Sequence, residues 1–171
     1  MSILILHHAQ WMLLVYGVDM KIIAHRANIG GPNLDVENNP DQIDKCISEG
    51  YDVEIDVRYD VFNNTFYLGH DEAQYNVTPY WLAQRMDYLW IHCKNIDALY
   101  HFTSKTGGYN YFWHQEDDHT LTSKNYIWTY PGKPYTSNAV IVMPEWNTSD
   151  WDSLRVTNCF GICTDYPEKL K

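Results

Sequence analysis

The chain has 171 residues, of which 45% are hydrophobic, and a formal net charge of −10 at pH 7. This length supports one sizeable core and excludes two ordinary domains. A strongly negative chain without a cluster of lysines and arginines is repelled by polyanions. We therefore expect a single domain whose partner is neither nucleic acid nor an anionic membrane.

The four cysteines form neither a CxxC pair nor a zinc-ligand spacing. Cys159 and Cys163 are close enough in sequence to bridge, but a chain with this much apolar content does not need a disulfide. We expect reduced thiols and a cytoplasmic location, with export as the alternative.

The first eighteen residues are largely apolar but carry His7, His8 and Gln10. They are too short for a membrane span, which needs about 20 apolar residues, and they lack the basic start of a signal peptide. Met20 stands directly before the first strand-like run. We predict that residues 1–19 are an N-terminal extension, arising from a misassigned start or a weak signal peptide, and that residues 20–171 form the working domain.

From residue 21 onward, strand-like and helix-like segments alternate, a pattern that favours a parallel sheet with crossover helices. Few helical patterns occur in the second half. The expected helices span residues 41–49, 79–86 and 97–104. The expected strands span residues 21–25, 51–57, 89–93, 109–115, 126–130, 139–143 and 160–164.

The second strand alternates valine or isoleucine with acidic residues, so that Asp52, Glu54 and Asp56 share one face. Burying the aliphatic face under helices would turn these carboxylates inward. Asn63-Asn64 then predicts a hairpin turn that brings the chain back and delivers His70 to the same region.

Two histidines, an arginine and two carboxylates thus lie at or near strand ends, a set that can grip a phosphodiester, hold a divalent cation and move protons. In their order and spacing these residues resemble the glycerophosphodiester phosphodiesterase family, a branch of the phospholipase C-like phosphodiesterase barrels. Residues 22–71 carry most of the likeness. The matching motifs are His25-Arg26, Glu37-Asn38, Gly50, Glu54-x-Asp56, Gly69-His70-Asp71 and Thr164-Asp165-Tyr166-Pro167.

The resemblance implies a TIM-type (βα) barrel. Because a complete barrel usually takes about 250 residues, we expect a reduced or distorted one, with about seven parallel strands and few helices in its second half. The resemblance also implies a role in lipid metabolism, in which such phosphodiesterases take part.

The resemblance also implies the site. His25 and His70 would be the acid/base pair, Arg26 and Lys94 would bind the substrate phosphate, and the metal would lie at the acidic pair and His92. Carboxylates at Glu54 and Asp56 favour Mg²⁺ or Ca²⁺.

One departure from the family falls in that metal site. The family usually has a glutamate two residues before the lysine of the third strand, whereas this chain has His92 before Lys94. A nitrogen ligand favours a transition metal such as Mn²⁺ or Zn²⁺; otherwise His92 is not a ligand and forms part of the pocket wall.

We therefore predict a metal-assisted phosphodiester hydrolase that acts on a small glycerol- or polyol-phosphate diester. One alternative releases a cyclic phosphate by attack of a substrate hydroxyl. A second is a non-catalytic barrel that binds a phosphate or glycan, and a third is a carbohydrate-active barrel using Glu116 and Glu145, which would leave His25 and Arg26 without a role. The oligomeric state is left open.

Overall fold

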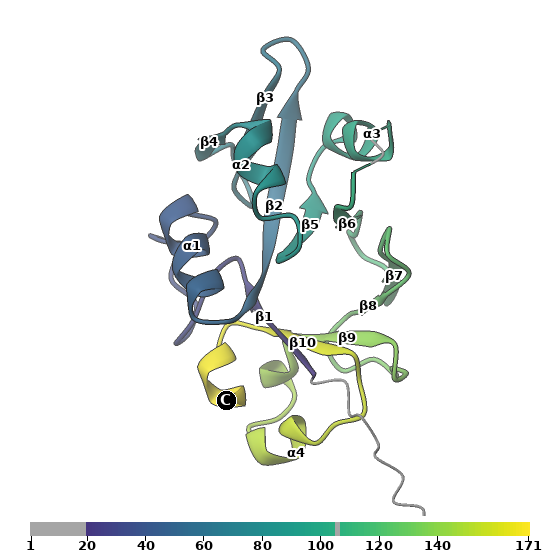
Figure 1. Ribbon diagram of the computed structural model, residues 1–171. Helices are drawn as coiled ribbons and strands as arrows, with labels where there is room; N and C mark the ends of the chain where they lie inside the picture. Colours follow the sequence, from purple (N-terminus) through teal and green to yellow (C-terminus); the bar gives the residue numbers. More distant parts are fainter. Residues whose placement is uncertain (1–19, 105–106) are drawn as a thin grey trace, which may run out of the picture.

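The computed structural model describes residues 20–104 and 107–171, and they form one ten-stranded sheet that curls into an incomplete barrel (Figure 1). The predicted extension, residues 1–19, lies outside the described residues, so the division of the chain stays a prediction. The strands are β1 (Lys21–His25), β2 (Asp52–Asp60), β3 (Thr65–Leu68), β4 (Tyr75–Val77), β5 (Leu89–Cys93), β6 (Asn110–Phe112), β7 (His119–Leu121), β8 (Ile127–Thr129), β9 (Ala139–Val142) and β10 (Gly161–Thr164).

Parallel pairing runs through the path β6–β5–β2–β1–β10–β9–β8, while β3, β4 and β7 pair antiparallel. The strands of this path correspond to the predicted ones, but the sheet as a whole is mixed, because β3, β4 and β7 add antiparallel pairs. The strands β4 and β7, which have three residues each, are not among the predicted ones. The expected hairpin at Asn63-Asn64 is present between β2 and β3.

The barrel does not close by strand pairing between β6 and β8 within the described ranges. Instead the backbone N–H of Ser123 donates to the carbonyl of Tyr111 over 2.8 Å, and the Ser123 hydroxyl accepts from the Tyr111 N–H over 3.0 Å. This thin contact, together with the missing crossover helices, makes the barrel a distorted one, as expected from its length.

Helices cover the first half of the sheet and are short in the second half, as predicted (Figure 1). Apolar residues of the two longer helices pack on the aliphatic face of β2 in one core cluster that includes Ile43, Ala98 and Phe102. The helices are α1 (Pro40–Ser48), α2 (Pro79–Ala83), α3 (Ile96–Ser104) and α4 (Trp151–Arg155), with short 3₁₀ turns η1 (Pro144–Trp146) and η2 (Pro167–Leu170).

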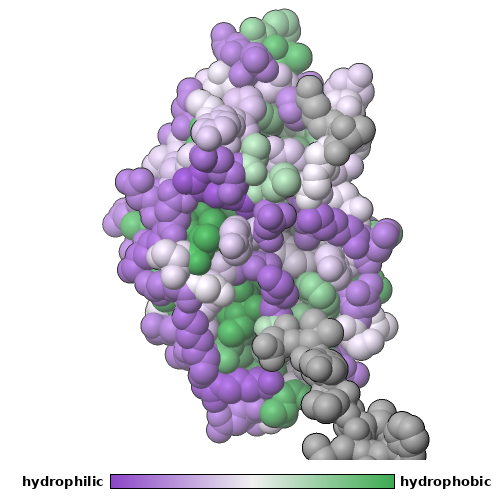
Figure 2. Space-filling view, viewed as in Figure 1, coloured by the Kyte–Doolittle hydropathy of each residue, from purple (hydrophilic) through white to green (hydrophobic). Residues whose placement is uncertain are grey.

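The surface seen in Figure 2 is mostly hydrophilic, with separate hydrophobic patches. No helix in the described parts of the chain is long and apolar enough to cross a membrane. All four cysteines are free thiols in the structure.

The alternation predicted for β2 is confirmed and sets the position of the acidic pair. Val53, Ile55 and Val57 join the core under the helices, whereas Glu54 and Asp56 point to the opposite face and are 2% and 0% exposed. Asn38 stabilises this arrangement, since its amide donates to Asp56 Oδ2 over 3.0 Å and its carbonyl oxygen accepts from the Asp56 backbone N–H over 2.9 Å.

We expect Asn38→Ala to lower the free energy of unfolding by about 2 to 4 kcal/mol, because it removes one hydrogen bond from the buried Asp56 carboxylate and one from the Asp56 backbone N–H, and places alanine in the left-handed conformation (φ 60°). Asn125→Ala is a matched control, as Asn125 has φ 66° and is exposed, and it should cost about 1 kcal/mol. Urea unfolding followed by circular dichroism measures both, and equal losses would contradict a special role for Asn38.

Candidate active site

A cavity of about 650 Å³ opens at the carboxyl ends of the parallel strands, where barrel and open-sheet proteins carry their sites. Six of the seven predicted site residues line it, and the seventh, Asp56, lies directly behind Glu54 and His92. The lining residues are His25, Arg26, Pro32, Leu34, Glu37, Glu54, His70, His92, Lys94, His114, Gln115, Trp128, Tyr130, Pro131, Val142, Met143, Trp146 and Asp165.

Strand register brings the central residues together. In the parallel pair β1–β2, His25 lies beside Glu54, and in the pair β2–β5, Asp56 lies beside His92. Because paired residues of neighbouring strands point to the same face of a sheet, the two histidines flank the two carboxylates.

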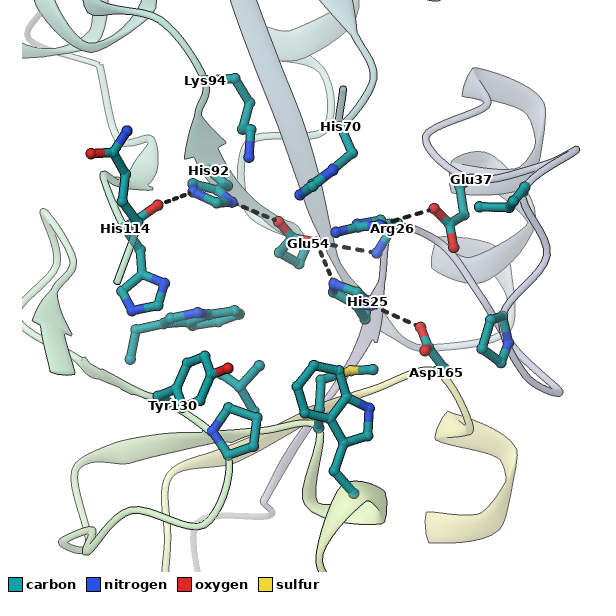
Figure 3. Close-up of a pocket in the computed structure, with 18 residues that line it drawn as sticks. His25, Arg26, Glu37, Glu54, His70, His92, Lys94, His114, Tyr130 and Asp165 are labelled. Carbon is teal, nitrogen blue, oxygen red and sulfur yellow. Dashed lines mark hydrogen bonds and ion pairs between the residues drawn. The ribbon is translucent and has the colours of Figure 1, made fainter. Parts of the chain in front are cut away.

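His25 is oriented by a carboxylate. Its Nδ1 lies 2.8 Å from Asp165 Oδ1, and its Nε2 lies 4.0 Å from Glu54 Oε2 (Figure 3). An ionised carboxylate only accepts, so Nδ1 donates and Nε2 is the nitrogen presented to the cavity. Burial lowers the pKa of His25, but the hydrogen bond to Asp165 and the charge of Glu54 outweigh it and leave that pKa raised.

Asp165 is itself held by two polar contacts. The Asn28 amide donates to its Oδ1 over 2.8 Å, and its backbone N–H donates to Glu145 Oε1 over 2.9 Å. The Thr164 hydroxyl donates to the same Glu145 oxygen over 2.8 Å. The carboxylate that orients His25 is therefore fixed from the first loop and from the turn η1.

Arg26 and Ala27 both have left-handed backbone, with φ of 49° and 66°. Such residues are uncommon among non-glycines and gather at functional sites. The turn aims the Arg26 backbone N–H at Glu54 Oε2 (3.2 Å), while the guanidinium contacts Glu37 Oε2 (3.2 Å) and Asp56 Oδ2 (3.3 Å). Burial lowers the pKa of Arg26, and the charges of Asp56 and Glu54 more than offset this, so it is raised.

Glu54, Asp56 and His92 form a cluster whose ligand atoms lie within 4.8 Å of one another. His92 Nε2 lies 2.8 Å from the carbonyl of His114, which can only accept, so Nε2 carries a proton. Nδ1 then faces Asp56 Oδ1 at 3.2 Å. It also faces Glu54 Oε1 at 3.7 Å (Figure 3).

This cluster fits a divalent cation. Asp56 Oδ1 is buried and has no hydrogen-bond partner within the described residues. In a neutral His92 the Nδ1 lone pair also points at the carboxylates, and metal-bound histidines commonly donate their other N–H to a backbone carbonyl. The Nδ1 of His92 and the carboxylates of Glu54 and Asp56 thus converge. The contacts that orient them, from the His114 carbonyl to His92 and from the Asn38 amide to Asp56, are present in the structure.

The two acids of the cluster have different pKa directions. Burial and repulsion from Asp56 raise the pKa of Glu54. Burial also acts to raise the pKa of Asp56, but its contact with His92 and the charges of Arg26 and Lys94 lower it overall. If the pair Glu54 and Asp56 holds one proton, that proton therefore lies on Glu54.

His70 lies on the loop after β3, with its Nδ1 2.7 Å from Asp71 Oδ1. Arg58 contacts the carbonyls of Gly69, His70 and Asp71 and so fixes this loop. Gly69 has φ 141°, and a Cβ there would collide with the carbonyl of Glu72, so a larger residue would displace the loop. The pKa of His70 is lowered, first by burial, with the charge of Asp56 opposing and Arg26 adding to it.

Lys94 follows β5, and its ammonium lies 3.8 Å from Asp56 Oδ1. With Arg26 it supplies two cationic side chains to the cavity. The predicted residues thus lie together, though their roles stay predictions. Sequence reasoning did not single out Asn28 or the contact of Glu37 with Arg26, because an Asn/Gly/Pro-rich loop before a helix gives no signal of which side chains turn inward.

Comparison with known proteins supports the fold. The chain is similar to the crystal structure of glycerophosphodiester phosphodiesterase from Agrobacterium tumefaciens str. C58, with a TM-score of 0.53 and 14% identity over 88% of this chain and 97% of that one. No family model and no curated protein matches the sequence. The resemblance seen in the motifs is thereby confirmed at the level of the fold.

We expect Mn²⁺ to bind the metal-free protein and raise its melting temperature, because binding only to the folded state stabilises it. Nitrogen coupling from His92 should appear in the pulsed electron paramagnetic resonance of bound Mn²⁺. His92→Glu should remove that coupling while retaining metal, and His119→Ala, outside the cavity, should retain both. Coupling that persists in His92→Glu would rule out His92 as the ligand.

Asp165→Asn should lower the pKa of His25, measured by proton NMR titration in the presence of a chelator. A raised histidine pKa stabilises the folded state below the unfolded value of about 6.5, and this stabilisation is lost as pH rises through the folded pKa. The stability difference between wild type and variant should therefore shrink with rising pH. An unchanged pKa would show that Asp165 does not set the state of His25.

Proposed function

We propose that the protein is a metal-assisted phosphodiester hydrolase with a histidine acid/base pair, acting on a small glycerol- or polyol-phosphate diester. The observation that carries the proposal is the joint presence, at one cavity, of an oxygen and nitrogen metal cluster, two cationic side chains and two histidines. The fold shared with a phosphodiesterase supports it.

The cationic side chains would hold the substrate phosphate. Arg26 is fixed by Glu37 and Asp56, so its remaining N–H groups are oriented before substrate arrives. Lys94 adds a compact charge from the other side of Asp56. A cation at Glu54, Asp56 and His92 would polarise a phosphate oxygen and neutralise its developing charge.

The two histidines would move the protons. Each has its Nδ1 bound to an aspartate, His25 to Asp165 and His70 to Asp71, and each therefore presents Nε2. An imidazole oriented in this way can take a proton from the attacking hydroxyl group or donate one to the leaving oxygen, and its aspartate stabilises the charged form. Attack by water gives hydrolysis, and attack by a neighbouring substrate hydroxyl gives a cyclic phosphate.

We propose Mn²⁺ or a similar transition ion as the metal. The imidazole of His92 supports this choice, because a nitrogen donor favours such ions, whereas the two carboxylates alone would favour Mg²⁺ or Ca²⁺. A small molecule is the proposed partner, supported by the net charge of −10, which disfavours nucleic acid. The cytoplasmic location stays a prediction, with the four free thiols in its support.

Phosphorus NMR of a glycerophosphodiester panel, with Mn²⁺, Mg²⁺ or Ca²⁺ and with chelator, tests the proposal. We expect metal-dependent turnover that falls at least 100-fold in His25→Ala and in His70→Ala, because each loses a proton-transfer group. His119→Ala, whose imidazole contacts the carbonyl of Pro134 outside the cavity, should retain activity.

The product separates the mechanisms, since a cyclic phosphate has its own chemical shift. Binding of the substrates without turnover under any metal would reject the hydrolase in favour of a phosphate-binding barrel.

A further inference from the structure

The cavity has two sides of different chemistry. Its charged side comes from β1, β2, β5 and the loops that follow them. Its other side comes from β8, β9 and the segments after them. We call this second side the apolar wall, and it consists of Trp128, Tyr130, Val142, Met143 and Trp146.

The apolar wall has a buried floor and an exposed rim. Trp128, Val142 and Met143 are 9% exposed or less, whereas Tyr130 and Trp146 are 40% and 63% exposed. Figure 3 shows Tyr130 on the opposite side of the cavity from Lys94 and His70. Large apolar side chains left in water at the mouth of a pocket favour an apolar ligand, since covering them returns roughly 25 cal/mol per Å².

A phosphate held at the charged side leaves most of a 650 Å³ cavity for the rest of the substrate. That remainder meets the apolar wall, whose side-chain hydrogen-bonding groups are the Tyr130 hydroxyl and the indole N–H groups of Trp128 and Trp146, and which has no ionised group. Because an indole N–H can only donate, the Tyr130 oxygen is the single side-chain acceptor of the wall. The hydroxyl hydrogens of a bare glycerol or sugar would therefore lack partners there, which weakens binding.

From this division we infer that the substrate alcohol carries an uncharged hydrocarbon chain, which lies along the apolar wall while the phosphate lies at Arg26 and Lys94. The substrate class is then a phosphodiester with an alkyl or acyl chain, which narrows the glycerol- or polyol-phosphate class. The placement of the substrate phosphate rests on the proposed function, whereas the placement of the hydrocarbon chain rests on the apolar wall alone.

Two probes that differ only in the chain test it: glycerophosphocholine and the same compound bearing one short acyl chain, kept below its micelle concentration. We expect kcat/KM at least tenfold higher for the acylated probe. In Trp146→Ala and in Tyr130→Ala, both at the exposed rim of the wall and so tolerant of truncation, this ratio should fall toward one. Phe62→Ala is a matched control, because Phe62 is 95% exposed outside the cavity, and it should keep the full ratio.

Equal kcat/KM for the two probes, or a ratio unchanged in both wall variants, would overturn the inference while leaving the hydrolase intact. A higher kcat/KM for glycerophosphocholine than for glycerophosphoglycerol would also overturn the inference. It would mean that the aromatic rings of the wall bind the choline cation instead of a hydrocarbon chain.

If neither probe is hydrolysed, the proposed function fails, and calorimetry decides the inference by itself. At least tenfold tighter binding of the acylated probe, lost in Trp146→Ala, supports the apolar wall as a chain site; equal affinities overturn it.

Discussion

The burial of two carboxylates on one strand is the constraint that organises this structure. Glu54 and Asp56 lie one residue apart on the inner face of β2, almost completely removed from water. Two like charges in such a place repel each other and lose their hydration, so surrounding groups must supply compensating charge and hydrogen bonds. Arg26 and Lys94 supply the charge, and Asn38 supplies the hydrogen bonds.

Compensation of this kind also explains the unusual backbone around the site. Arg26, Ala27 and Asn38 are non-glycine residues with positive φ, and all three lie on the segment that wraps the acidic pair. Their conformations cost energy, but they turn the Arg26 N–H toward Glu54 and the Asn38 amide toward Asp56. The Asn38 backbone N–H also donates to the Arg26 carbonyl, so each left-handed turn helps to hold the other.

How far the sequence predicts such a site depends on whether a residue lies on a strand or on a loop. Strand periodicity was enough to place Glu54 and Asp56 inward, and parallel register then brings His25 and His92 beside them without further information. The loop residue Asn28 was not foreseen, and neither was the contact of Glu37 with Arg26, because irregular segments have no period from which a direction can be inferred. The strands β4 and β7 also escaped prediction, whereas the equally short β6 and β8 lie within the longer aromatic-rich runs 109–115 and 126–130 that were predicted as strands.

The replacement of an expected glutamate by His92 shows how a site can change its donor set and keep its geometry. A third carboxylate would add another negative charge to a buried pair that already needs two cations and an asparagine. An imidazole instead brings a neutral nitrogen, and its Nε2 is satisfied by the carbonyl of His114 while its ring stacks on Phe112 at 5.1 Å between centroids. The side chain is thus held by its other contacts, which leaves Nδ1 directed at the carboxylates. The same substitution reduces the charge at the site and changes the metals that suit it, and this ties the electrostatics of β2 to the chemistry of the cavity.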